Sequence, residues 1–146
     1  MSYEVVWFKR DLRLHDHAPL AEAAARGPVL ALHCLEPSLW CQPDMSGAHL
    51  GFLRECLRDL EGALARHGIP LQVVTGEAVK ILEALHAAEP FTDLWSHEES
   101  GTIATWERDK AVQSWCRARS VTWHELPTGG VVRRLGDRDR WHFIWE

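Results

Sequence analysis

The most constraining feature of this sequence is an uninterrupted apolar run near its amino terminus, Val5-Val6-Trp7-Phe8. Two of these residues are β-branched and two are aromatic, which favours a strand. Because no polar residue alternates with the apolar ones, both faces of the strand must be covered, as in the centre of a parallel sheet. The charged stretch that follows, residues 9–13, therefore stands at the carboxyl end of a central strand, where open α/β sheets bind ligands.

Strand-like apolar segments alternate with helical patterns along most of the chain. We expect strands at residues 5–8, 29–35, 71–75, 91–97 and 121–126, and helices at 19–26, 47–67, 77–89 and 102–119. This alternation predicts an α/β fold, a doubly wound, Rossmann-like, five-stranded parallel sheet with strand order 3-2-1-4-5. In that order, residues 10–13 and 97–100 face one crevice.

Local signals add finer expectations. Asp16 is the expected N-cap of the first helix, and residues 36–46, with two prolines and no periodicity, are expected to form a long loop. The helix at 102–119 should turn residues 107–110 toward water. The longest helix, 47–67, carries a leucine stripe that should pack on the sheet: Leu50, Leu53, Leu57, Leu60 and Leu64.

The composition narrows the class of protein. A chain of 146 residues, 46% hydrophobic and 25% charged, is typical of one globular domain. It has neither an apolar run near the ~20 residues of a membrane span nor a signal-peptide pattern, so we expect a soluble cytoplasmic protein without a membrane partner. A net charge of −5 argues against this domain as the main nucleic-acid contact. Four cysteines without C-x-x-C spacing indicate reduced thiols: Cys34, Cys41, Cys56 and Cys116.

The motifs of several site classes are missing. Lys-Arg-Asp follows the first strand where a dinucleotide-binding fold has G-x-G-x-x-G, so pyrophosphate binding at that turn is not supported. His97, Glu98 and Glu99 bring an imidazole and two carboxylates to the crevice. Adjacent residues of an extended chain point in opposite directions, which disfavours an acid/base pair, and the absence of a third ligand at suitable spacing predicts no metal site. One glutamate is expected to cap the next helix or bind water, and a ligand role for one of them stays open.

Three stretches carry a family resemblance. The first is Trp7-Phe8-Lys9-Arg10-Asp11-Leu12-Arg13-Leu14, followed by Asp16-His17; the second is the helix beginning Ser46-Gly47-Ala48-His49-Leu50-Gly51-Phe52-Leu53; the third is Glu98-Glu99 with Arg108-Asp109-Lys110-Ala111-Val112. Together they resemble the amino-terminal region of the DNA photolyase and cryptochrome family, over most of residues 4 to 116. The resemblance implies that residues 1–128 form the family's α/β antenna domain. Residues 129–146 would start the linker to a FAD-binding helical domain that is absent here, and their Arg-rich tail would lie against that domain.

In that family this region can hold a light-harvesting antenna, such as methenyltetrahydrofolate, a deazaflavin or FMN. Folate-binding members use an Asn-Glu pair where this chain has Ala104-Thr105, so the antenna's identity, or an empty crevice, stays open. The resemblance carries candidate cofactor-binding residues over to six positions: Asp11, Leu12, Arg13, Phe52, Glu98 and Glu99.

The resemblance also implies the role of the full-length protein. It would be a deoxyribodipyrimidine photo-lyase-like flavoprotein, in which the FAD-binding domain contacts damaged DNA and splits pyrimidine dimers under light. The fragment alone is expected to be inactive. A cryptochrome blue-light photoreceptor domain is the first alternative, and a generic nucleotide-binding α/β domain is the second.

Overall fold

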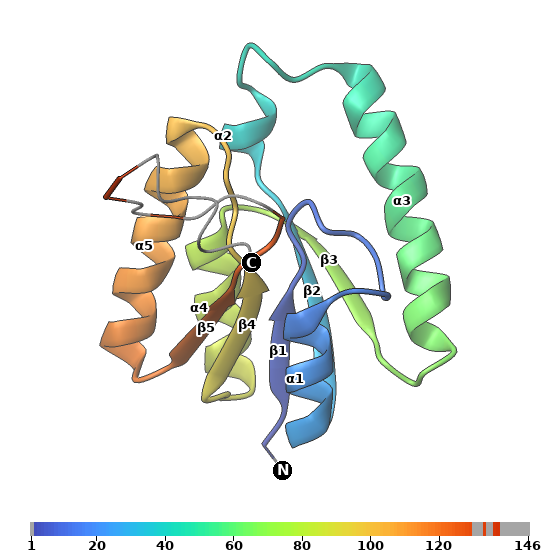
Figure 1. Ribbon diagram of the computed structural model, residues 1–146, viewed down its shortest axis with the longest axis vertical. Helices are drawn as coiled ribbons and strands as arrows, with labels where there is room; N and C mark the ends of the chain where they lie inside the picture. Colours follow the sequence, from blue (N-terminus) through green and yellow to red (C-terminus); the bar gives the residue numbers. More distant parts are fainter. Residues whose placement is uncertain (1, 130–132, 134–135, 138–146) are drawn as a thin grey trace.

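A computed structural model describes residues 2–129, 133 and 136–137. The expected linker and tail, residues 129–146, therefore fall mostly outside the described residues. One sheet contains every strand of the described part, in the order β3-β2-β1-β4-β5 and with all neighbours parallel, which confirms the predicted fold (Figure 1). The strands are β1 (Glu4–Trp7), β2 (Val29–Leu35), β3 (Leu71–Thr75), β4 (Asp93–His97) and β5 (Thr122–Leu126).

Helices cover both faces of this sheet, and the apolar run of β1 explains why. Val5 and Trp7 point into one hydrophobic cluster, while Val6 and Phe8 point into the other, as the two-residue period of a strand requires. The first cluster is completed by α4 and α5, and the second by α1 and the carboxyl half of α3. The helices are α1 (Ala18–Arg26), α2 (Pro37–Trp40), α3 (Gly47–Ala65), α4 (Ala78–Ala88) and α5 (Ile103–Arg119).

The N-cap of α1 is His17, so the prediction of Asp16 was wrong. Nδ1 of His17 accepts a hydrogen bond from the backbone N–H of Leu20 at 3.1 Å. Asp16 precedes the cap with a φ of 51°, in the left-handed region, which differs from the β-region backbone typical of an N-cap residue. An imidazole nitrogen thus supplies the acceptor that a carboxylate normally provides.

Two further local predictions need correction. The segment at residues 36–46 contains the short helix α2, because Pro37 suits the first turn of a helix and Glu36 has the extended backbone of an N-cap. The leucine stripe of α3 packs only in part: Leu57, Leu60 and Leu64 are buried, whereas Leu50 and Leu53 stay half-exposed. In Figure 1 the amino-terminal half of α3 projects beyond the carboxyl ends of the strands, where the sheet offers no surface to cover it.

The polar side of α5 faces water only in part: Glu107 and Lys110 are exposed as predicted, but Arg108 and Asp109 are not. Asp109 is buried, and the side chain of Arg108 is only 10% exposed. Both belong to an ion network at the carboxyl edge of the sheet. No helix in the described part of the chain is long and apolar enough to cross a membrane.

Candidate functional site

Two cavities lie side by side at the carboxyl edge of the sheet. The larger, about 650 Å³, lies among the ends of β1 and β2 and helices α2 and α3. The smaller, about 190 Å³, lies between the ends of β1 and β4. Lys9, Arg10 and Glu99 line both. The smaller cavity is the crevice predicted between residues 10–13 and 97–100, while the larger one extends away from it, toward α3.

Apolar atoms provide most of the surface of the larger cleft, although about half of its lining residues are charged or polar. Its volume lies within the range of small-molecule sites, about 300–1,000 Å³. Polar groups in such sites usually fix a ligand's orientation. The apolar members are Trp7, Leu12, Leu39, Trp40, Met45, Phe52 and Leu53, and the polar ones include Arg10, Arg13, His33, Glu36, Asp44, His49, Glu99, Thr105 and Arg108.

Arg108 organises the polar part of this cleft from the first half of α5. Its guanidinium pairs with Glu36 at 2.8 Å, with Asp109 at 2.9 Å and with Glu99, and it lies over the ring of Trp7 at 4.8 Å. Burial alone would lower the pKa of Arg108, but the three carboxylates raise it. Burial raises the pKa of Glu36, and Arg108 opposes that rise. These groups satisfy one another and form a fixed polar wall.

A second ion pair fixes the end of β1. Nζ of Lys9 lies 3.3 Å from Oδ2 of Asp109, with 4% and 9% of the two side chains exposed. The ammonium also lies 4.6 Å from the ring centre of Trp7 and 5.2 Å from that of Trp123. Burial lowers the pKa of Lys9, and the charge of Asp109 counteracts that effect. The loop after β1 is thereby tied to α5.

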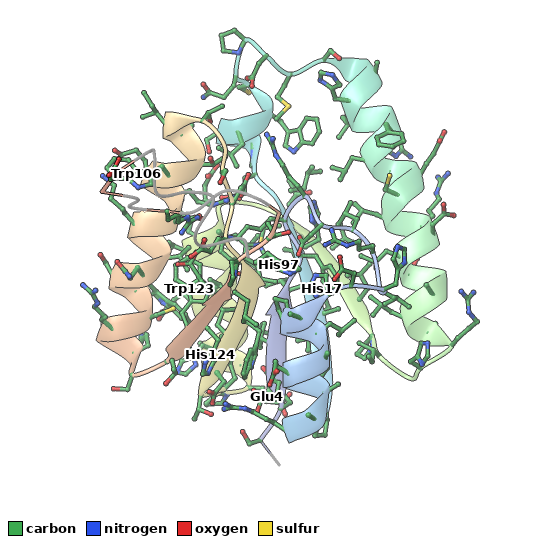
Figure 2. The ribbon with its side chains drawn as sticks, viewed as in Figure 1. Glu4, His17, His97, Trp106, Trp123 and His124 are labelled. Atoms are coloured by element: carbon green, nitrogen blue, oxygen red, sulfur yellow. The ribbon has the colours of Figure 1, made fainter. Side chains whose placement is uncertain are left out.

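The smaller cavity is lined by a carboxylate held between two imidazoles. Oδ2 of Asp11 lies 2.7 Å from both Nε2 of His17 and Nδ1 of His97, and its Oδ1 accepts the backbone N–H of Lys9 at 2.9 Å. Figure 2 shows the two histidines beside each other at the carboxyl edge, with Glu4 at the opposite end of the sheet. Burial would raise the pKa of Asp11, but contacts with the two imidazoles hold it well below its usual range.

Asp11, His17 and His97 are residue types that often bind metals, but the position of the proton on His17 does not suit a metal ion here. Nδ1 of His17 uses its lone pair to accept the Leu20 N–H, so the neutral ring carries its proton on Nε2, the atom that faces Asp11. A metal ligand needs a free lone pair at that position. The Nε2 contact also lies off the direction of a regular hydrogen bond and is best described as electrostatic. The trio anchors the start of α1 and the end of β4 to the loop after β1.

The structure divides the six predicted cofactor residues between the two cavities. Neither glutamate is the N-cap of α5, which is Thr102. Glu99 instead pairs with Arg108 and with Arg10, and Glu98 lies 3.8 Å from Arg133. The larger cleft takes Leu12, Arg13 and Phe52, the smaller one takes Asp11 and Glu98, and Glu99 lines both.

Sequence reasoning missed Glu36, Arg108, Asp109 and His33 as site residues, and it placed Lys9 at the ligand-binding edge without predicting its buried ion pair. A signal for Asp109 was present, because it stands three residues before the buried Val112 and therefore on the same helix face. A charged residue on that face predicts a buried ion pair. Glu36 offered a weaker signal, as a carboxylate directly after an apolar strand that ends at the carboxyl edge.

The arrangement suits binding and offers no activated nucleophile among the described residues. Burial raises the pKa of the Cys34 thiol to about 12, so the thiol beside the cleft stays protonated. The carboxylates of Glu36 and Glu99 are paired with Arg108. His33 donates from Nδ1 to the carbonyl oxygen of Phe8 at 2.9 Å, and burial lowers its pKa, which keeps the ring neutral.

Comparisons with known proteins agree with this architecture. The family model described as "DNA photolyase" matches residues 4–136. A deoxyribodipyrimidine photo-lyase of Salmonella typhimurium is 44% identical over 73 residues, which cover 49% of this chain and 15% of that protein. A cryptochrome DASH of Synechocystis is 31% identical over 101 residues, which cover 65% of this chain and 21% of that protein. The matched segments thus cover less than a quarter of the length of either relative.

A solved structure gives the same result for the fold. The crystal structure of an archaeal photolyase from Sulfolobus tokodaii, described as having two FAD molecules and implying a novel light-harvesting cofactor, superposes with a TM-score of 0.75 at 24% identity. The superposition covers 84% of this chain and 28% of that one. The family match and the shared fold together confirm the resemblance found in residues 7–17, 46–60 and 98–112.

Proposed function

Because this chain belongs to the DNA photolyase family and forms its amino-terminal α/β domain, we propose that it is an antenna domain that holds a flat, light-absorbing molecule in the larger cleft. When bound, such a molecule would absorb light and pass its excitation energy to a flavin elsewhere in the full-length protein. The domain's own task would be to bind and orient it.

The observation that carries this proposal is the cleft itself. Its volume of about 650 Å³ suits a heteroaromatic ring system with a short tail, and Trp40 and Phe52 offer ring faces along its wall. The side chain of Phe52 is 70% exposed, and a ligand stacked on its ring would remove that apolar surface from water. The fit to an antenna molecule is therefore one of shape and of lining chemistry.

The charged groups of the cleft favour an anionic ligand tail at its rim. Arg10 keeps 59% of its side chain exposed although it contacts Glu99 at 3.3 Å, and Arg13 lines the same cleft. Both stand on the loop after β1, where a phosphate or carboxylate tail would find a positive field. The ring of the ligand would then lie deeper, near Arg108 and its partners.

For the full-length protein, we propose light-driven splitting of pyrimidine dimers. FAD and damaged DNA would bind to a further domain, against which this domain would pack, and the fragment alone would leave dimers intact. The names of the relatives support both this function and photoreception, since one is a deoxyribodipyrimidine photo-lyase and the other a cryptochrome DASH. Blue light with a thymine-dimer oligonucleotide, applied to the fragment and to the full-length protein, tests both statements.

Chromophore binding is tested most directly by a titration of the chain with candidate molecules. Methenyltetrahydrofolate, an 8-hydroxydeazaflavin and FMN would each be added while tryptophan emission is recorded, because Trp7 and Trp40 line the cleft. We expect at least one to quench that emission saturably with micromolar affinity, and AMP and ATP to leave it unchanged. Saturable binding of ATP or AMP with none of the three chromophores would replace this proposal by a nucleotide-binding function.

A further inference from the structure

Among the buried side chains that line the larger cleft, one acceptor atom makes no hydrogen bond to the described chain. Glu36 accepts from Arg108 and from the backbone N–H of Ala78, and both oxygens of Glu99 contact arginines. Thr105 donates its hydroxyl to the carbonyl of Thr102. Asp44 and His49 also line the cleft, but both are exposed to water. The buried acceptor that remains is the second ring nitrogen of His33, which stands on β2.

The tautomer of His33 follows from its single protein contact. Nδ1 lies 2.9 Å from the carbonyl oxygen of Phe8, and a carbonyl can only accept, so Nδ1 carries the proton. The neutral ring then has a lone pair on Nε2. Phe8 is itself held in place, because its N–H donates to the carbonyl of Leu32 at 2.8 Å. The ring of His33 is thus fixed by the backbone at the end of the central strand.

The surroundings of His33 leave Nε2 open to the cleft. The residue as a whole is only 5% exposed, but its Nε2 keeps some contact with solvent. Among the described residues, His17 Nε2 is the one side-chain nitrogen or oxygen that is fully buried and has no hydrogen bond. Leu32 and Cys34 point into the cluster formed with α4 and α5. Strand alternation therefore turns His33 to the opposite face, the side of α3 and the cleft.

We propose that His33 determines ligand specificity by accepting a hydrogen bond at Nε2 from a ring N–H of the bound chromophore. The inference rests on the proposed antenna function and narrows the ligand class to flat rings with an imide or lactam N–H at their inner edge. A ring without such a donor would leave the buried nitrogen unpaired and should therefore bind more weakly, by about tenfold or more. Apolar contacts with Trp40 and Phe52 would hold either kind of ring equally.

The assignment is tested by comparing ligands with and without the ring N–H, each on proteins with and without the His33 acceptor. FMN and an 8-hydroxydeazaflavin each carry one imide N–H, at N3, and N3-methylation removes it with little change in shape elsewhere. Each compound and its N3-methyl derivative would be titrated against the chain and against His33→Phe, which keeps a flat ring but has no acceptor. We expect methylation to weaken binding to the unaltered chain about tenfold or more, and to change binding to His33→Phe less than threefold.

The outcomes separate this inference from the proposed function. An equal loss on methylation in both proteins overturns the role of His33 while leaving the antenna function intact. Absence of saturable binding by either parent compound overturns both. Thermal unfolding of His33→Phe checks that the variant folds.

A measurement on the unaltered chain covers the case in which His33→Phe does not fold. Nitrogen-15 spectra of histidine-labelled protein should show His33 protonated at Nδ1, and the Nε2 resonance should shift when FMN or the deazaflavin binds but not when the N3-methyl derivative does. A proton found on Nε2 in the free protein, or the same shift with both forms of the ligand, would contradict the proposal.

Discussion

Lys9 and Asp109, 100 positions apart in sequence, form a buried ion pair with 3.3 Å between Nζ and Oδ2. The pair joins the loop after the central strand to the helix that follows β4. It also places the ammonium of Lys9 over the rings of Trp7 and Trp123. The same ammonium thus makes both an ion pair and two cation–π contacts. The shape of the cleft floor depends on this contact.

Replacing Asp109 with Asn should lower the free energy of unfolding by about 3 kcal/mol, because it leaves the ammonium of Lys9 buried without its nearest carboxylate. Urea denaturation at neutral pH measures this loss. The double variant Lys9→Met with Asp109→Leu should recover the part of the loss that comes from Lys9, but not the part that comes from the contact of Asp109 with Arg108. Glu107→Gln is the matched control, since its pair with Lys110 is about half exposed and should contribute less than about 0.5 kcal/mol. A loss as small as that control's for Asp109→Asn would contradict the structural role of the pair.

The four cysteines should differ sharply in their rates of alkylation. Burial raises the pKa of Cys34 and of Cys116 to about 12, so at pH 8 only about one thiol in 10,000 is ionised at each position. Cys41 is exposed and should react first with iodoacetamide. Because the thiolate is the reactive form, the two slow rates should rise about tenfold per pH unit between pH 7 and pH 9. Peptide mass spectrometry gives the four rates, and equal rates for Cys34 and Cys41 in the folded protein would be incompatible with the burial described.

Phe52→Ala should separate binding from stability. The side chain is 70% exposed, so its removal should change the free energy of unfolding by less than about 0.5 kcal/mol. Loss of its ring face should weaken chromophore binding about tenfold. Leu60→Ala on the same helix is the comparison, because Leu60 is 3% exposed and its truncation should cost about 2–5 kcal/mol. Unchanged affinity in Phe52→Ala would remove α3 from the binding surface.

Two glycines near the carboxyl end of α3 should respond oppositely to alanine. Gly62 lies inside the helix with nothing within 4 Å of an added Cβ, so Gly62→Ala should stabilise the protein by about 0.5–1 kcal/mol. Gly68 has a φ of 71°, where an alanine is strained, and Gly68→Ala should destabilise by about 1 kcal/mol. Melting temperatures of the two variants, measured side by side, check both signs.

The sheet could be predicted because each strand is marked by the pattern of apolar residues within its own short segment. The run from Val5 to Phe8 requires cover on both faces, and a strand covered on both faces in an alternating α/β chain takes the central place. The crevice between the ends of β1 and β4 followed from that position. Contact between Asp11 and His97 is its direct outcome.

The larger cleft could not be predicted because it forms where helix α3 extends past the edge of the sheet and is no longer packed against it. A leucine stripe shows which helix face is apolar, but it does not show how far the helix extends past the sheet. The polar wall was missed for a related reason. Arg108 and Asp109 look like a solvated pair in sequence, and their burial arises from Lys9 and Glu36, which come from two other strand ends.

Burial along α3 is uneven, and this has a consequence for its motions. The buried leucines all belong to its second half, so the first two turns are held by few apolar contacts. Backbone amides there should exchange with deuterium well before those near Leu60 and Leu64, through openings that leave the sheet intact. The first two turns of α3, which bear Phe52, should thus unfold and refold locally. Such local opening would let a bulky ligand enter the larger cleft without global unfolding of the domain.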